Sequence, residues 1–369
     1  MKLRYNSLVA VWCLCCISCT SLQRTSTQPD TLSATALLPF GRTTITPDHN
    51  LELISSAVHF GYSFEGTESQ VYASIPNPEG HNYLQYKLDG VYQGRVKVSG
   101  GTAAPLTIKA PTAGKHEVWV YKATEAHTGP VIIEKVTGNK LQPLRNTAAP
   151  TIEFIGNSIT CGAAADPSEV PCGTGVYHDQ HNAYMAYGPR VARTLGAGYV
   201  LSSVSGIGMY RNWNSDGPTM PEVYEKANLQ KNSSKLWNFN TFTPQIVSIA
   251  LGTNDFSNGD GKRERLPFDS ASFIQQYTGF VQLVKSKYPK AQIALLSSPM
   301  VQGTNARILQ NALTAVKTSI DAAYPADAPV ALYFFEPMQA RGCSGHPNVE
   351  DHGIMARQLE PFFRELLQK

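Results

Sequence analysis

The second part of the chain alternates between short apolar runs and helical stretches, and this alternation leaves few folds open to it. Apolar runs of strand length lie at 151–156, 198–204, 245–251, 291–297 and 329–335. Apolar residues recur at helical spacing in 270–287 (Phe273, Tyr277, Phe280, Val281, Val284) and near the C-terminus (Met355, Leu359, Phe362, Phe363, Leu366). Strands that alternate with helices form a parallel sheet covered on both faces. We therefore predict an α/β domain over residues 151–369.

The first part of the chain shows a different pattern, in which short strand-like runs are separated by turn residues. Four such runs are 70–75, 83–88, 94–98 and 116–121. Asp89-Gly90, between two of them, is a hairpin turn signal. Because no helical period is present and short strands follow at regular spacing, we predict a β-sandwich over residues 36–140. Residues 141–150 contain two prolines and no periodicity, which is typical of a linker.

The N-terminus has the pattern of a secretory signal peptide. Lys2 and Arg4 supply positive charge, and residues 7–18 form an apolar run that is too short to span a bilayer. We predict a signal peptide over residues 1–18 and therefore an exported protein. The formal net charge of +3 includes Lys2 and Arg4, so the remainder carries only +1. Such a balance gives no electrostatic reason to expect binding to nucleic acid or to an anionic membrane surface.

The end of this signal, Cys16-Ile17-Ser18-Cys19, is similar to a bacterial lipobox, in which the cysteine becomes the lipidated first residue. We predict lipidation of Cys19, followed by a flexible tether over residues 19–35 that is rich in Ser and Thr. The protein is then a periplasmic or cell-surface bacterial lipoprotein that meets the membrane only through its lipid anchor. The alternative is cleavage by ordinary signal peptidase.

Three short stretches in the second part carry side chains suited to ester hydrolysis. They are Gly156-Asn157-Ser158-Ile159-Thr160, Gly252-Thr253-Asn254-Asp255 and Gly345-His346-Pro347-Asn348. Ser158 follows an apolar run, which places it at the carboxyl edge of the sheet, where a strand leads into a helix. A serine hydroxyl needs a nearby base to act as a nucleophile, and His346 is the candidate base. Asn254 offers a side-chain amide to a developing oxyanion.

In this order the stretches resemble the sequence blocks of the SGNH hydrolases, also called GDSL esterases. That family has a serine, a glycine, a GxND and a histidine block, and the glycine block here is Ser203-Val204-Ser205-Gly206. Its four functional residues map onto Ser158, Gly206, Asn254 and His346. The resemblance is closer still to carbohydrate esterase family 2, in which a jelly-roll domain precedes the hydrolase, and Arg211-Asn212-Trp213-Asn214 also looks like that family. The resemblance covers nearly all of the chain after the signal peptide.

The resemblance implies a flavodoxin-like α/β/α sandwich preceded by an all-β jelly roll, and a serine esterase that removes acetyl groups from polysaccharides such as xylan. Ser158 and His346 are then catalytic, and the oxyanion hole consists of the Ser158 and Gly206 N–H groups and the Asn254 amide. No cofactor and no metal is implied, and the partner is an acetylated polysaccharide or oligosaccharide. Two alternatives stay open, a related hydrolase of lipid esters or thioesters and an inactive glycan-binding lipoprotein.

The chain departs from the wider family at two positions. Asn157 stands where Asp is usual, and it keeps a polar side chain for bonding within the turn. Cys343 stands three residues before His346, where many members place the Asp that orients the histidine. We therefore expect a Ser–His dyad in which a main-chain carbonyl orients His346, as the resemblance to family 2 implies. Asp351 and Glu336 are the side-chain alternatives.

Neighbouring residues offer competing assignments. Gly208 competes with the glycine of the second block, and His352 is expected on the last helix in a packing role. A group of nearby residues also has the types found in zinc sites, namely Cys343, His346, Asp351 and His352. His178 and His181 follow Cys172 in a loop and are predicted to be solvated.

Two further features bear on the site. Trp213 is a candidate substrate-binding platform, because aromatic rings stack on the apolar faces of sugars; its alternative is a packed loop residue, and Tyr210 is a weaker candidate. Three of the seven cysteines, namely Cys161, Cys172 and Cys343, lie beyond the signal peptide and Cys19. An oxidising compartment makes one disulfide expected. Cys161–Cys172 is the candidate pair, and a pair of Cys343 with either one is the competing possibility.

Overall fold

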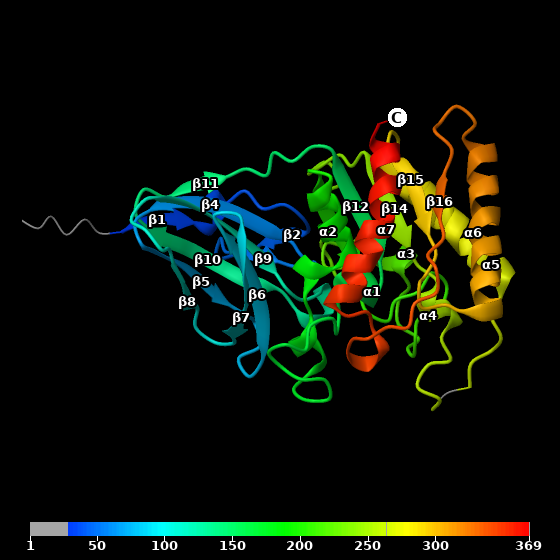
Figure 1. Ribbon diagram of the computed structural model, residues 1–369, viewed down its shortest axis with the longest axis horizontal. Helices are drawn as coiled ribbons and strands as arrows, with labels where there is room; N and C mark the ends of the chain where they lie inside the picture. Colours follow the sequence, from blue (N-terminus) through cyan, green and yellow to red (C-terminus); the bar gives the residue numbers. More distant parts are fainter. Residues whose placement is uncertain (1–28, 263, 369) are drawn as a thin grey trace, which may run out of the picture.

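The computed structural model describes residues 29–262 and 264–368 and shows two domains in contact along the long axis of the molecule (Figure 1). The predicted signal peptide, Cys19 and most of the predicted tether lie outside the described residues. Within the described ranges, no helix is both long and apolar enough to cross a membrane.

The first domain is a β-sandwich of two antiparallel sheets, as the short-strand pattern predicted. One sheet has the order β2-β3-β10-β5-β8 with β1 paired to β10, and the other has the order β11-β4-β9-β6-β7. The strands are β1 (Asp30–Ser33), β2 (Thr43–Ile45), β3 (Leu51–Leu53), β4 (His59–Glu65), β5 (Glu68–Ser74), β6 (His81–Leu88), β7 (Val91–Ser99), β8 (Ala104–Lys109), β9 (Lys115–Lys122), β10 (Val131–Gly138) and β11 (Gln142–Leu144). Asp89 and Gly90 join β6 to β7 with φ angles of 50° and 83°, as a two-residue hairpin turn requires. Apolar side chains from both sheets form one closed core.

The sandwich is longer at both ends than the sequence predicted. Strand β1 lies inside the predicted tether and pairs with β10, while β11 lies inside the predicted linker and pairs with β4. Both strands are short and mostly exposed or half-buried, and Leu32 is the only buried residue of β1. These strands therefore add backbone hydrogen bonds to sheet edges and bury little apolar surface, which is why no apolar pattern marks them.

The second domain is a parallel five-stranded sheet with helices on both faces. Its strands lie in the order β13-β12-β14-β15-β16, and every neighbouring pair is parallel. Each predicted apolar run contains one of them: β12 (Thr151–Gly156), β13 (Gly198–Ser203), β14 (Ile246–Ala250), β15 (Gln292–Leu296) and β16 (Ala331–Tyr333). The helices are α1 (Ser158–Cys161), α2 (Tyr187–Thr194), α3 (Met220–Val223), α4 (Thr253–Phe256), α5 (Ser270–Lys287), α6 (Gly303–Ala323) and α7 (Val349–Leu367). Short 3-10 turns occur in both domains: η1 (Ala34–Ala36) and η2 (Ala126–Thr128) in the first, and η3 (Tyr177–Gln180), η4 (Ala183–Met185) and η5 (Cys343–Gly345) in the second.

The two faces of this sheet bury different helices. Successive strand residues point to opposite faces, so Phe154 of β12 packs with α2 and α7, whereas Ile155 packs with α5 and α6. Phe154 meets Phe363 of α7 edge to face at a centroid distance of 5.8 Å. The last helix therefore covers the strand that leads to Ser158 (Figure 1).

The strand order also decides where the site lies. The chain runs from β12 outward to β13 and then returns across β12 to β14. This reversal opens a crevice beyond the carboxyl ends of β12 and β14, where ligands bind in such sheets. Ser158 follows β12 and Asn254 follows β14, so the fold brings both to this crevice.

Candidate active site

Ser158 is the first residue of α1 and is held in a tight strand-to-helix turn. The side chain of Asn157 accepts a hydrogen bond from the Ile159 N–H at 3.1 Å, which caps the helix as the turn role of this residue predicted. Gly156 is required because an added Cβ would lie 2.0 Å from Thr160 Oγ1. The turn therefore fixes the Ser158 backbone, and its hydroxyl faces the crevice.

His346 lies against the Ser158 hydroxyl. Its Nε2 is 2.9 Å from Ser158 Oγ, and its Nδ1 is 3.1 Å from the backbone carbonyl of Ser344. Since a carbonyl only accepts, Nδ1 carries the proton and Nε2 presents its lone pair to the serine hydroxyl. Burial lowers the pKa of His346 more than the hydrogen bond to Ser344 raises it, so the imidazole is neutral near pH 7. This is the arrangement of a general base beside a nucleophile.

Among the residues that the structure describes, no carboxylate is hydrogen-bonded to His346, in line with the expectation drawn from Cys343. Asp351 accepts instead from Arg341 Nε at 2.7 Å and from the Asn348 N–H at 3.1 Å, at the start of α7. Glu336 is exposed. The Ser344 carbonyl is thus the orienting group, and both side-chain alternatives are wrong.

The expected oxyanion donors surround the same cavity. It has a volume of about 510 Å³, and its lining includes Ser158, Gly206 and Asn254. One N–H of the Asn254 amide donates to the Ile207 carbonyl at 2.7 Å, which fixes the side chain and leaves its second N–H for a ligand. Asp255, the next residue, accepts from the N–H groups of 209, 210 and 211 at 3.0, 2.9 and 3.2 Å. The GxND block therefore anchors the loop that carries Gly206.

The two aromatic candidates, Trp213 and Tyr210, lie in different environments. Trp213 is 43% exposed and lines the catalytic cavity, as well as a second cavity of about 400 Å³ that also includes His127. Tyr210 packs edge to face on Phe273, and its hydroxyl accepts from the Asp269 N–H at 3.1 Å. Trp213 is accordingly positioned to meet a ligand, and Tyr210 holds its loop.

Tyr177 of η3 is a cavity residue that sequence reasoning missed. Its hydroxyl lies 3.5 Å from His346 Nε2 and 3.4 Å from Ser205 Oγ. A lone tyrosine in a loop a few residues after Cys172 carries no recognisable motif. Its place in the cavity follows from the packing of η3 against the first domain.

Glu125, just before η2 in the first domain, is the second missed residue. Its Oε2 accepts from the Ser205 N–H at 2.6 Å, and its Oε1 lies 3.2 Å from His181 Nε2. Burial raises the pKa of this carboxyl, but the bonds from His181 and Ser205 outweigh that effect and lower the pKa to about 2. His181 is itself fully buried, so the prediction that it is solvated is wrong; His178 is half-buried. A side chain of the first domain therefore forms a hydrogen bond with Ser205, the residue directly before Gly206.

We expect Glu125→Ala to lower kcat by about 10- to 100-fold with a smaller change in KM. The Ser205 N–H and His181 would lose their partner, and small displacements of catalytic groups cost rate in this range. Glu125→Gln should recover part of the loss, because its amide oxygen still accepts from Ser205. Glu79→Ala, at an exposed position of the same domain, is the matched control. Equal kcat in Glu125→Ala and the control would contradict this role.

The disulfide is not the candidate pair Cys161–Cys172 but the competing possibility, a pair of Cys343 with one of the other two cysteines. Cys172 is bonded to Cys343, and Cys161 is a buried free thiol. Cys161 lies within α1 and contacts Ser203 Oγ at 3.2 Å, so it faces the interior, away from the loop that carries Cys172. The Cys172–Cys343 bond joins the loop before η3 to the loop that carries His346. These loops are 171 residues apart in sequence and come together only in the folded domain.

The structure also excludes the alternative zinc site formed by Cys343, His346, Asp351 and His352. Cys343 is in the disulfide, and Asp351 is bonded to Arg341. His352 lies inside α7, accepts from the Tyr187 N–H at 3.3 Å, and has a pKa lowered to about 3 by burial. As predicted, it is a packing residue of the last helix.

Comparison with known families agrees with this geometry. The first domain matches the carbohydrate esterase 2 N-terminal family over residues 40–146, and the second matches the GDSL-like lipase/acylhydrolase family over residues 154–352. The chain is 24% identical over 375 residues to an acetylxylan esterase / glucomannan deacetylase of Cellvibrio japonicus, covering 100% of this chain and 99% of that protein. It is 29% identical over 313 residues to a cellulase/esterase of Acetivibrio thermocellus, covering 80% of this chain but only 35% of that longer protein.

Solved structures share both domains. A family two carbohydrate esterase from Clostridium thermocellum in complex with cellohexaose has a TM-score of 0.78 and 26% identity, covering 92% of this chain and 99% of that chain. A family two carbohydrate esterase from Cellvibrio japonicus has a TM-score of 0.80 at 23% identity and shares the fold, covering 92% and 98% of the two chains. From its matched domains and its converging sequence blocks, the chain belongs to the GDSL-like lipase/acylhydrolase family and has the two-domain organisation of carbohydrate esterase family 2.

Proposed function

We propose that this protein is a carbohydrate O-acetyl esterase that deacetylates polysaccharides of the xylan type through an acyl-enzyme on Ser158. The observation that carries the proposal is the contact of Ser158 Oγ with His346 Nε2 at 2.9 Å, in a cavity that also contains Gly206 and Asn254. The acetylxylan esterase / glucomannan deacetylase named above supports the choice of ester and of substrate class.

In the proposed reaction, Ser158 Oγ attacks the acetyl carbonyl carbon while its proton moves to His346 Nε2. Hydrogen bonds from the N–H groups of Ser158 and Gly206 and from the free amide N–H of Asn254 stabilise the negative charge that develops on the carbonyl oxygen. Collapse of this intermediate breaks the bond to the sugar oxygen, which takes the proton from His346. Water, deprotonated by His346, then attacks the acetyl-enzyme and releases acetate and Ser158.

The shape of the site suits an acetyl group on a large alcohol. The cavity is open to solvent, and the exposed ring of Trp213 stands at its side. We assign Trp213 as a sugar platform beside the reacting ester. A second cavity on the same tryptophan gives room for a neighbouring sugar unit.

The assignment is tested by acetate release from a panel of acetylated glycans, compared with hydrolysis of p-nitrophenyl esters of increasing chain length. Xylan-type substrates and p-nitrophenyl acetate should be turned over fastest. A preference for long acyl chains would favour a lipase or thioesterase, and binding of glycan without turnover would favour an inactive glycan-binding protein.

The pH dependence of kcat/KM for p-nitrophenyl acetate should show an acid limb with its midpoint below pH 6.5. His346 must be neutral to accept the serine proton, so activity falls as the pH drops through its pKa. Because burial lowers that pKa, activity should persist to more acidic pH than an ordinary histidine allows. A midpoint at or above pH 6.5 would contradict this assignment of the base.

We further propose that the protein is exported and anchored by lipid at Cys19, on the basis of the signal and lipobox patterns. The full-length protein should then partition with membranes after cell fractionation, and Cys19→Ser should release it into the soluble fraction. Wild-type protein found only in the soluble fraction would show that the lipobox interpretation is wrong.

A further inference from the structure

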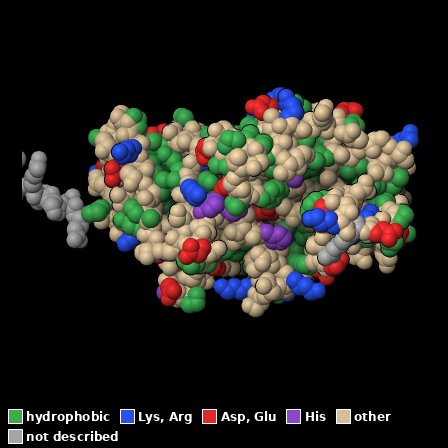
Figure 2. Space-filling view, turned by 90° about the horizontal axis from the view of Figure 1, so that it is seen from below, with side chains coloured by type: hydrophobic (Ala, Val, Ile, Leu, Met, Phe, Trp, Pro, Cys, Tyr) green, Lys and Arg blue, Asp and Glu red, His purple; other side chains and the backbone are tan. Residues whose placement is uncertain are grey.

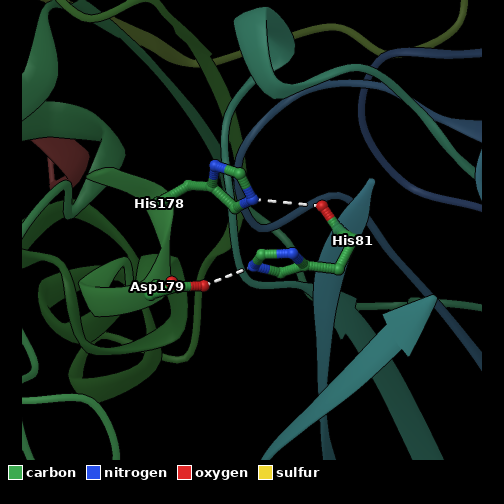
Figure 3. A group of neighbouring side chains, drawn as sticks. All are labelled: His81, His178 and Asp179. Atoms are coloured by element: carbon green, nitrogen blue, oxygen red, sulfur yellow. Dashed lines mark hydrogen bonds and ion pairs between the residues drawn. The ribbon is translucent and has the colours of Figure 1, made fainter. Parts of the chain in front are cut away.

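A second group of reactive side chains lies at the boundary between the two domains, outside the lining of the catalytic cavity. His81 begins β6 in the first domain, and His178 and Asp179 belong to η3 in the second (Figure 3). Each offers one metal-ligand atom, and these atoms lie within 4.8 Å of one another. On the face shown in Figure 2, histidine side chains gather near the middle of the molecule, where the domains meet.

We propose that His81, His178 and Asp179 form a binding site for a divalent transition-metal ion of the zinc class that links the two domains. Two imidazoles and one carboxylate are a donor set that Zn²⁺ accepts, with a further position left for water. None of the three residues lines the catalytic cavity.

The two ligands on η3 are adjacent in sequence and are shielded from solvent. His178 is half-buried and Asp179 is buried.

The carboxylate is also held in place by groups behind it. Asp179 Oδ2 accepts from the Val176 N–H at 2.7 Å, Oδ1 accepts from the Tyr83 hydroxyl at 2.9 Å, and its backbone carbonyl accepts from Arg95 at 2.6 Å. Hydrogen bonds of this kind orient metal-binding carboxylates and raise affinity. Tyr83 and Arg95 come from the first domain, so the support crosses the boundary as well.

Without metal, the ligands bond to one another. His81 Nε2 lies 2.5 Å from Asp179 Oδ1, and His178 Nε2 donates to the His81 carbonyl at 3.0 Å (Figure 3). A bound ion would replace the first bond by two coordinate bonds. A ring that binds the ion through Nε2 has no proton on that nitrogen, so for both His81 and His178 the proton must lie on Nδ1 instead. The ring centroids of His81 and His178 are 4.8 Å apart, and binding of an ion requires His81 Nε2 and Asp179 Oδ1 to move apart from their 2.5 Å contact.

The full chain, without an added histidine tag and after treatment with a chelator, should bind one Zn²⁺ in a calorimetric titration. Co²⁺ should give visible absorption bands typical of nitrogen and oxygen ligands, and Zn²⁺ should displace it. His81→Phe keeps the aromatic contacts and removes one ligand, and it should weaken binding at least about 10-fold. His178→Ala and Asp179→Asn should do the same, with folding checked by circular dichroism.

His49→Ala is the matched control, because His49 is exposed and lies outside the group. It should bind Zn²⁺ and Co²⁺ as the wild type does. The proposal is overturned if the wild type gives no saturable binding, or if His81→Phe, folded, binds both ions as tightly as the control. The second result would assign the ions to other surface groups.

Discussion

Ser158→Ala and His346→Ala are each expected to lower kcat for p-nitrophenyl acetate by on the order of 10⁴–10⁶-fold. The first variant removes the atom that forms the acyl-enzyme, and the second removes the group 2.9 Å away that takes its proton. Because the two act as one unit, the double variant should be little worse than either single variant. Release of p-nitrophenol under saturating substrate measures the effect, and circular dichroism confirms that each variant is folded.

Asp351→Ala and Glu336→Ala are the matched comparisons. Neither carboxylate orients His346, so both variants should keep kcat within a few-fold of the wild type. Asp351 binds Arg341 and the start of α7, so Asp351→Ala is expected to lose stability instead. A loss of kcat in a folded acid variant as large as that in His346→Ala would show that a side-chain triad exists.

The second large effect is expected at Asn254. Asn254→Ala should lower kcat by about 10²–10³-fold with little change in KM, because it removes a donor that acts mainly on the charged intermediate. The amide is held by the Ile207 carbonyl at 2.7 Å, so it needs no rearrangement when the charge develops.

Asn240→Ala serves as its control, since Asn240 is exposed and does not line the cavity. It should behave as the wild type does. If Asn254→Ala raises KM and leaves kcat unchanged, the amide binds substrate in its ground state and is not part of the oxyanion hole.

The features that could be predicted from the sequence are those set by a periodic pattern of apolar residues or by a short local motif. Four of the five apolar runs contain strands that are almost wholly buried, because a strand buried on both faces needs apolar residues throughout. The fifth run contains β16, a half-buried strand at the sheet edge. Ser158, Asn254 and His346 were found because each lies in a short motif at the end of a strand or before a helix. Cys343 in the place of an acid also indicated a carbonyl-oriented base, which the Ser344 contact matches.

The parts that were missed depend on contacts between distant segments. Glu125 meets Ser205, 80 residues later in the chain, and nothing around Glu125 marks it as unusual. The Cys172–Cys343 bond spans 171 residues, whereas the predicted pair lay close together in sequence. His181 was expected in solvent because its loop is polar, but the carboxylate that accompanies it comes from the other domain.

Glu125 has a consequence for how such a protein can be rearranged by evolution or by protein engineering. The hydrolase fold begins at Thr151, yet a group that holds its glycine loop sits upstream, in the other domain. A polypeptide that begins at Thr151 would keep the nucleophile, the base and the amide, but would lose this support. Exchange of the sandwich for that of an unrelated protein would have the same result. The two domains are therefore expected to be inherited together, and the smallest piece that retains full turnover is larger than the hydrolase fold itself.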